Sequence, residues 1–249
     1  MNAQLRIRDL ERAARSRSKR QRQNLTSALH DADPMVRGRA VGLLAEMGDV
    51  QSARLITELL GDDNAEVRYD AAQALENLLS GSKRAPIELL KLLKDQDALV
   101  RVQALDALAA IDDKGTARTV AALLRDSDAL VRAHAAECIA DLDGHQQLSR
   151  VRAQAHRERS PLAQVGFLDA LYRLGGDQFL EPLIRKLASK SYRVRCAAAN
   201  SLNALELKPE ARQSAISALR AAKRTPIAKA DLEAVTRALG TLRSSSKGA

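Results

Sequence analysis

Apolar residues in this chain recur with the period of an α-helix, and the whole pattern is itself repeated. The repeated pattern carries the dipeptide Val-Arg at Val36, Val67, Val100, Val131 and Val194. The intervals are 31, 33, 31 and 63 residues, and the last, about two periods, predicts a degenerate copy at Ser160–Asp177. Apolar residues follow each Val at positions 4, 8 and 11 almost throughout, on one face of a helix. A fixed period of this length predicts a solenoid of six copies over residues 25–207.

Each copy divides into two helical stretches joined by an acidic turn. The first stretch is a short apolar run, such as residues 53–62 or 117–126, and the second starts just before Val-Arg. Aspartates lie five or three positions before the Val: Asp31, Asp62, Asp95 and Asp126 at five, Asp33, Asp97 and Asp128 at three. An aspartate there caps the amides of the second helix. The arginine after the Val is available to carboxylates of its own turn or the next copy, which predicts a structural ladder.

The pattern D-x-D-x-x-V-R-x-x-A-x-x-x-L at residues 31–44, 95–108 and 126–139 resembles HEAT repeats of the short, bilin-lyase-like kind. This resemblance implies an all-α, right-handed α-solenoid of about six helix pairs. We expect a C-terminal capping pair at residues 208–241 and a flexible tail at 242–249. Residues 1–24 are expected to form a basic N-terminal arm or a capping helix.

The composition agrees with packed helices in a soluble protein. Apolar residues make up 45% of the chain and aromatic residues only 2%, so the core is expected to consist of Leu, Ala, Val and Ile. The two cysteines, Cys138 and Cys196, have no zinc-site spacing. No apolar run approaches the roughly 20 residues that span a bilayer. We predict a cytoplasmic protein that does not bind membranes.

Catalytic relatives of the HEAT family provide a test for enzymatic residues. Deoxyhypusine hydroxylase needs repeated His-Glu dyads to hold iron, and no histidine here precedes a glutamate. HEAT-like DNA glycosylases rely on aromatic side chains, but the chain has no Trp, three Tyr and two Phe. Common nucleotide-binding, zinc-protease and hydrolase motifs are absent. We therefore predict a non-enzymatic protein without cofactor or metal, while a bilin-lyase-like enzyme stays an alternative because no short motif tests it.

The net charge of +9 invites a nucleic-acid interpretation, but the charge is uneven. Residues 1–24 carry a net charge of +6 and residues 216–249 carry +5, which leaves −2 for residues 25–215. The basic arm is represented by Arg15, Arg17, Lys19, Arg20 and Arg22. Nucleic-acid binding through these termini is the alternative to protein binding.

In HEAT-like arrays the second helices line the concave side, and positions 3, 6 and 10 after the Val face outward there. Across the six copies these positions hold six acids and two arginines. Such a surface is either merely solubilising or a groove that attracts a basic protein segment. The residues predicted to bind protein are Arg39, Asp70, Asp106, His134, Glu137, Asp141, Asp169, Tyr172 and Arg173. The predicted function is a protein-binding scaffold or adaptor, with a toxin-neutralising immunity protein among the candidates.

The fifth copy departs from the others. Gln164 replaces the ladder arginine, and Phe167 replaces the alanine found at position 4 elsewhere. The larger ring is expected to push helices apart, which predicts a change of curvature or stacking at this copy. Tyr172 is expected to be partly exposed. This irregularity is either ordinary drift of the repeat sequence or a binding hot spot.

Overall fold

The computed structural model describes residues 2–15, 19–224 and 229–244. These residues form fifteen α-helices and no strand. The chain divides into two compact units, Met1–Leu123 and Leu124–Ala249, which are called unit 1 and unit 2 below.

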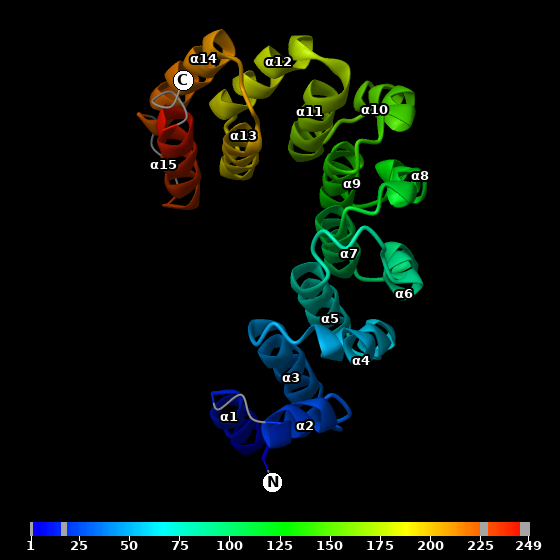
Figure 1. Cartoon of the computed structure of the whole chain (residues 1–249). Helices are drawn as coiled ribbons and strands as arrows, with labels where there is room; N and C mark the ends of the chain where they lie inside the picture. Colours follow the sequence, from blue (N-terminus) through cyan, green and yellow to red (C-terminus); the bar gives the residue numbers. More distant parts are fainter. Residues whose placement is uncertain (1, 16–18, 225–228, 245–249) are drawn as a thin grey trace. The chain divides into compact units, whose positions relative to one another are not determined.

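Unit 1 is a stack of helix pairs (Figure 1). Its helices are α1 (Ala3–Ala14), α2 (Lys19–Ala28), α3 (Pro34–Glu46), α4 (Ala53–Glu58), α5 (Ala65–Leu78), α6 (Ile87–Lys91), α7 (Ala98–Ile111) and α8 (Ala117–Val120). The longer helices α3, α5 and α7 pack side by side in succession, and α2, α4 and α6 each pack against one of them. Helix α1 extends the row of long helices by packing against α3.

Unit 2 continues the same alternation of short and long helices. Its helices are α9 (Ala129–Asp141), α10 (Leu148–Ala155), α11 (Pro161–Gly175), α12 (Leu180–Arg185), α13 (Tyr192–Ala204), α14 (Pro209–Lys223) and α15 (Lys229–Ser244). Helices α9, α11, α13 and α15 pack in succession, with α10 and α12 against α11 and α14 against α15. The predicted all-α solenoid of six helix pairs with a C-terminal pair is thereby confirmed.

The long helices begin where the sequence places their capping residues. Asp33, Asp97 and Asp128 accept hydrogen bonds from the first amides of α3, α7 and α9. Asn64 and Ser160 do the same for α5 and α11. Each side chain satisfies helix amides that would otherwise lack a partner, which explains why the turn residues set these starts.

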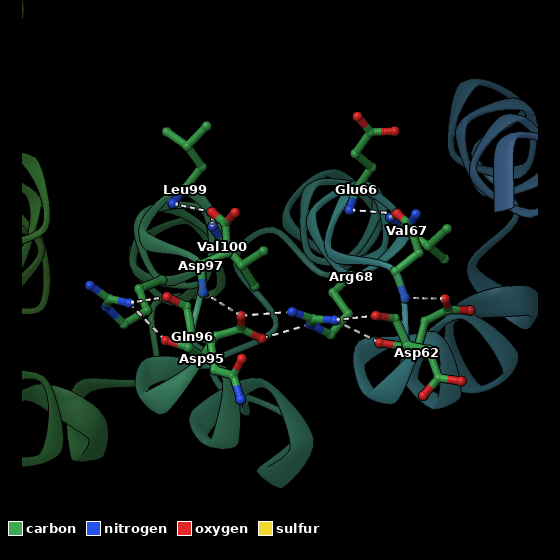
Figure 2. Close-up of polar contacts among 12 residues, drawn as sticks. Asp62, Glu66, Val67, Arg68, Asp95, Gln96, Asp97, Leu99 and Val100 are labelled. Carbon is green, nitrogen blue, oxygen red and sulfur yellow. Dashed lines mark hydrogen bonds and ion pairs between the residues drawn. The ribbon is translucent and has the colours of Figure 1, made fainter.

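The predicted ladder of arginines and turn carboxylates is present in both units. Arg68 donates from Nε and Nη2 to the carboxylate of Asp95, at 2.7 and 2.8 Å (Figure 2). Its Nη1 also donates to the main-chain oxygens of Asp62 and Asp63 in its own turn, at 2.8 and 3.2 Å. Arg37 binds Asp62 in the same way, and in unit 2 Arg132 binds Glu158. At these three places the ladder therefore fixes one turn to the next.

Helix α11 of the fifth copy packs closely against α9. Phe167 of α11 is only 1% exposed, but it does not push α11 away from α9. A Cβ atom on the neighbouring Gly166 would lie 2.6 Å from the main-chain oxygen of Ala133 in α9. On this side of α11 no separation is seen, because the missing side chain at Gly166 lets the two backbones approach, while the ring of Phe167 fills space at the outer side of α11.

Candidate protein-binding grooves

The predicted inner-face residues of unit 2 line a groove formed by α9, α11 and α13, called the unit-2 groove below. Its volume is about 680 Å³. The lining residues are His134, Glu137, Asp141, Asp169, Arg173, Ala197, Asn200, Ser201, Ala204, Leu205 and Glu206. Five of the predicted binding residues therefore lie together in one concave surface.

Arg173 binds two carboxylates in this groove. Its Nη2 lies 2.6 Å from Oδ1 of Asp141 on α9, and its Nη1 lies 3.4 Å from Oδ2 of Asp169, one turn earlier on α11. The guanidinium is thus held between two acids from neighbouring repeats. The sequence pattern predicted a row of like-charged acids here. Arg173 neutralises part of their negative charge.

Asp169 is not a surface acid, although its helical position predicted one. It is only 4% exposed. Burial raises its pKa to about 6, against the opposing effects of Arg173 and of a hydrogen bond with the hydroxyl of Ser201. The carboxyl group of Asp169 therefore changes charge in a range where an ordinary aspartate stays ionised.

The rest of the groove is more accessible. Glu137 and His134 are half-exposed, and Glu206 is exposed just beyond the end of α13. Among the lining residues, four carboxyl groups face one guanidinium. The groove is acidic when Asp169 is ionised and remains so when it is protonated.

Tyr172 lies away from this groove. It is half-buried against the apolar core built by α12 to α15. Burial raises the pKa of its hydroxyl, with a further contribution from the charge of Asp177, which forms an ion pair with Lys208. The prediction of partial exposure is confirmed, but the structure does not bring Tyr172 together with the other predicted binding residues.

A second groove, the unit-1 groove, lies along α3 and α5 and has a volume of about 740 Å³. It is lined by Ile7, Met35, Gly38, Arg39, Gly42, Ala45, Glu46, Asp70, Gln73, Ala74 and Asn77. Arg39 binds Glu11 at 3.0 Å and Glu46 at 3.1 Å. Asp70 is half-buried beside Gly38, and this burial raises its pKa. The unit-1 groove thus has Arg39 paired with acids in the way that Arg173 is paired in unit 2.

Asp106 on α7 is half-exposed and does not line the unit-1 groove. It lies near Glu76 of α5, whose pKa is raised by burial and by the charge of Asp106. A hydrogen bond of 2.5 Å from Gln103 to Glu76 lowers this pKa and so opposes both effects. Asp106 therefore belongs to a polar contact between α5 and α7.

Most of the described part of the predicted basic arm is helical, in α1 and α2. Arg15 is exposed beyond the end of α1, and Arg20 is exposed on α2. Arg22 approaches Asp49 at 3.3 Å and donates to Gln51 at 3.2 Å. Arg17 and the side chain of Lys19 lie outside the described residues. Part of this charge is thus bound to the protein's own turn rather than presented to solvent.

Two residues of the unit-2 groove were missed by the sequence pattern. Ser201 lies seven positions after Val194, at a position assigned to neither the core stripe nor the inner face. Glu206 follows Leu205, whose extended backbone ends α13. The apolar pattern stops at that point, so a helical wheel does not place the side chain, although a charged residue directly after a helix end is visible in the sequence.

None of the described helices is long and apolar enough to cross a membrane. No group of three or more His, Cys, Asp and Glu side chains with a metal-binding arrangement occurs among the residues the structure describes.

A row of long helices, each covered by a short helix, defines the class of α-solenoid repeat proteins. The model of the HEAT repeats matches residues 1–76, 22–95 and 85–165. The chain therefore belongs to the HEAT-repeat family. The comparison with curated proteins gives no match.

Several solved structures are similar to this chain. One is the CpcE–CpcF complex of phycocyanin lyase from Nostoc sp. PCC7120, with 18% identity, a TM-score of 0.66, and 89% of this chain and 94% of that chain covered. Human deoxyhypusine hydroxylase has 19% identity and a TM-score of 0.39, with 98% and 92% covered. A designed armadillo repeat protein has 20% identity and a TM-score of 0.42, with 88% and 98% covered.

Proposed function

We propose that the protein is a non-enzymatic scaffold that binds a basic segment of a partner protein in the unit-2 groove. HEAT-repeat solenoids commonly mediate protein interactions. The observation that carries the proposal is the excess of carboxyl groups over guanidinium groups among the lining residues of one concave surface.

The chemistry of the groove favours lysine and arginine side chains. Carboxylates accept strong charge-assisted hydrogen bonds from guanidinium and ammonium groups. A surface of one sign also speeds the encounter with a partner of opposite sign. Glu137 and Glu206 lie on different parts of the groove, α9 and the end of α13, so a bound segment that reaches both spans its width.

The test is binding of a fluorescent Lys- and Arg-rich peptide, followed by anisotropy, to the wild type and to a Glu137→Gln, Glu206→Gln variant. We expect about tenfold weaker binding by the variant, because it loses two charges from the groove. The matched control is Glu58→Gln, Glu181→Gln, which removes two exposed acids of the short helices α4 and α12. Equal losses in both variants would show non-specific charge attraction and would refute the groove.

The likeness to the phycocyanin lyase structure favours one alternative, a bilin-lyase-like enzyme. Its test is co-expression with a bilin and absorption spectroscopy of the purified protein. A stoichiometric coloured chromophore on the chain would replace the scaffold proposal with an enzymatic one.

A further inference from the structure

Positive charge is concentrated on the short-helix side of unit 2. The segments 148–160 and 180–193, which hold α10, α12 and the turns after them, contain eight basic and two acidic residues. The equivalent segment 50–64 contains one basic and three acidic residues, and 114–128 contains three and two. The near-neutral total of residues 25–215 therefore hides a strongly basic face.

Most of this charge is presented to solvent. Seven of the eight basic side chains are exposed: Arg150, Arg152, Arg157, Arg159, Arg185, Lys190 and Arg193. Of the two acids, Glu158 is buried and accepts both hydrogen bonds from Arg132 in the ladder. Only Glu181 is left as an exposed acid in these two segments. We call this surface the basic face.

An apolar cavity opens within the basic face. This outer pocket has a volume of about 420 Å³ and is lined by Ala155 of α10, Gln164, Phe167 and Leu168 of α11, and Pro182 and Lys186 after them. Arg185 lies at the same cavity. An apolar pocket with a few polar groups at its edge is the usual form of a binding site.

The irregular fifth copy creates this pocket. Gln164 stands where the other copies have the ladder arginine, and its Nε2 donates to the main-chain oxygen of Glu158 at 2.8 Å. Its Oε1 accepts from Nζ of Lys186 at 2.5 Å. The half-buried ammonium of Lys186 is thus held by a neutral amide. Among the described residues no carboxylate pairs with it, in contrast to the ladder arginines Arg37 and Arg132.

We propose that the basic face binds an acidic peptide segment of a partner protein, which inserts one apolar side chain into the outer pocket. Acidic side chains of the segment lie against the exposed arginines and Lys186, and the apolar side chain contacts Leu168 and Pro182. The pocket combines a central apolar anchor with a charged rim, as in the energetically important part of protein interfaces.

Two other occupants fit this face less well. Single-stranded nucleic acid is usually bound by stacking successive bases on several exposed aromatic rings. Phe167 is only 1% exposed, and Tyr192 is the single exposed aromatic residue in the segments 148–160 and 180–193. A membrane surface is bound by exposed large apolar side chains beside the basic ones, and Tyr192 is the one such residue in the segments 148–160 and 180–193. The concave apolar pocket favours a peptide over both.

The basic face is independent of the unit-2 groove. The groove is formed by the long helices α9, α11 and α13, whereas the basic face is carried mainly by α10, α12 and their turns. One unit thus offers surfaces of opposite charge, and an adaptor can use them for two partners. Either surface can fail its test without affecting the other.

The test uses the full chain and two short fluorescent glutamate-rich peptides, one with a central Phe and one with Ser in its place. We expect the Phe peptide to bind about tenfold more tightly than the Ser peptide. The Arg157→Glu, Arg185→Glu variant is expected to lose at least about tenfold in affinity for both peptides. The matched control is Arg118→Glu, Arg125→Glu, which reverses two exposed arginines of the preceding copy and is expected to bind as the wild type does.

A substitution that fills the outer pocket distinguishes the contribution of the apolar side chain to binding from the contribution of the charges. An Ala155→Phe substitution is expected to abolish the preference for the Phe peptide while leaving binding of the Ser peptide unchanged. Circular dichroism and urea unfolding show that each variant is folded. Equal binding of both peptides by the wild type, equal loss in the two arginine variants, or tighter binding of a single-stranded RNA or of phosphatidylserine vesicles would overturn the proposal.

Discussion

Gly166 of α11 lies against the backbone of Ala133 in α9. A Cβ atom on Gly166 would be 2.6 Å from the main-chain oxygen and 2.8 Å from Cα of Ala133. Helix backbones that approach so closely leave no space for any side chain. This contact places Asp169 and Arg173 of α11 beside Asp141 of α9, and thus shapes the unit-2 groove.

A Gly166→Ala substitution is expected to destabilise the protein by about 1–3 kcal/mol, because the added methyl group forces the two backbones apart. The matched control is Gly42→Ala in the middle of α3, where the nearest atom lies 3.8 Å from the added Cβ. The control is expected to be neutral or up to about 1 kcal/mol more stable, since alanine favours helices. Urea unfolding followed by circular dichroism measures both. Equal effects would show that the close approach does not matter.

The ladder contacts predict that Arg68→Ala strongly lowers the free energy of unfolding. The side chains of Arg68 and Asp95 are 15% and 7% exposed, so removal of the guanidinium leaves a nearly buried carboxylate without its partner. We expect a loss of about 3 kcal/mol in the free energy of unfolding. Arg68→Lys is expected to lower the free energy of unfolding by a smaller amount, because lysine keeps the charge but cannot make the paired hydrogen bonds. Arg54→Ala, an exposed arginine of α4, is the control and is expected to change little.

The ladder carboxylates also predict sensitivity to acid. Burial acts to raise the pKa of Asp95, but the hydrogen bonds from Arg68 and from the amide of Asp97 outweigh it and lower the pKa. As the pH falls, Asp95 of the unfolded chain is protonated near pH 4, whereas Asp95 of the folded protein is protonated only at a lower pH. The free energy of unfolding therefore falls as the pH drops below about 4. The urea midpoint of the wild type is expected to fall steeply below about pH 4. A shallower fall in Arg68→Ala would identify Asp95 as a source, and an equal fall would contradict this role.

The repeat architecture could be predicted because its determinants are local. The apolar spacing after each Val, the capping residue before it and the arginine beside it act over one helix or one turn, and each recurs at a nearly fixed interval. The register leaves two candidates for the partner of Arg68, the carboxylate of Asp62 in its own turn and that of Asp95 in the next copy, and the structure shows Asp95. Short-range chemistry repeated in sequence therefore predicts short-range contacts repeated in space.

The candidate sites depend on packing between repeats, which a helical wheel does not give. Asp169 shares its wheel position with Glu137, but Asp169 is buried and Glu137 is half-exposed. The large ring of Phe167 predicted a separation, whereas its neighbour Gly166 decides the distance between α9 and α11. Summing charge over the whole solenoid also concealed the basic face, because acids elsewhere in residues 25–215 offset it.

The last prediction concerns Asp169, whose pKa of about 6 follows mainly from burial. The folded state holds this proton more tightly than the unfolded chain, whose aspartates have a pKa of about 4. The contribution of Asp169 to stability is therefore fully present below about pH 4 and is lost as the pH rises through about 6, by up to about 3 kcal/mol. An Asp169→Asn variant should lack this loss, because its amide stays neutral.

The measurement is the difference in the free energy of unfolding between Asp169→Asn and the wild type, at several values between pH 4 and pH 8. The difference is expected to increase in favour of the variant as the pH rises, and to level off above the pKa of Asp169. Asp141→Asn is the control, because Asp141 binds the same Arg173 but is exposed. A difference that does not change with pH for Asp169→Asn would show that this carboxyl group titrates as an ordinary aspartate, and that the groove keeps its full charge at about pH 6 as well.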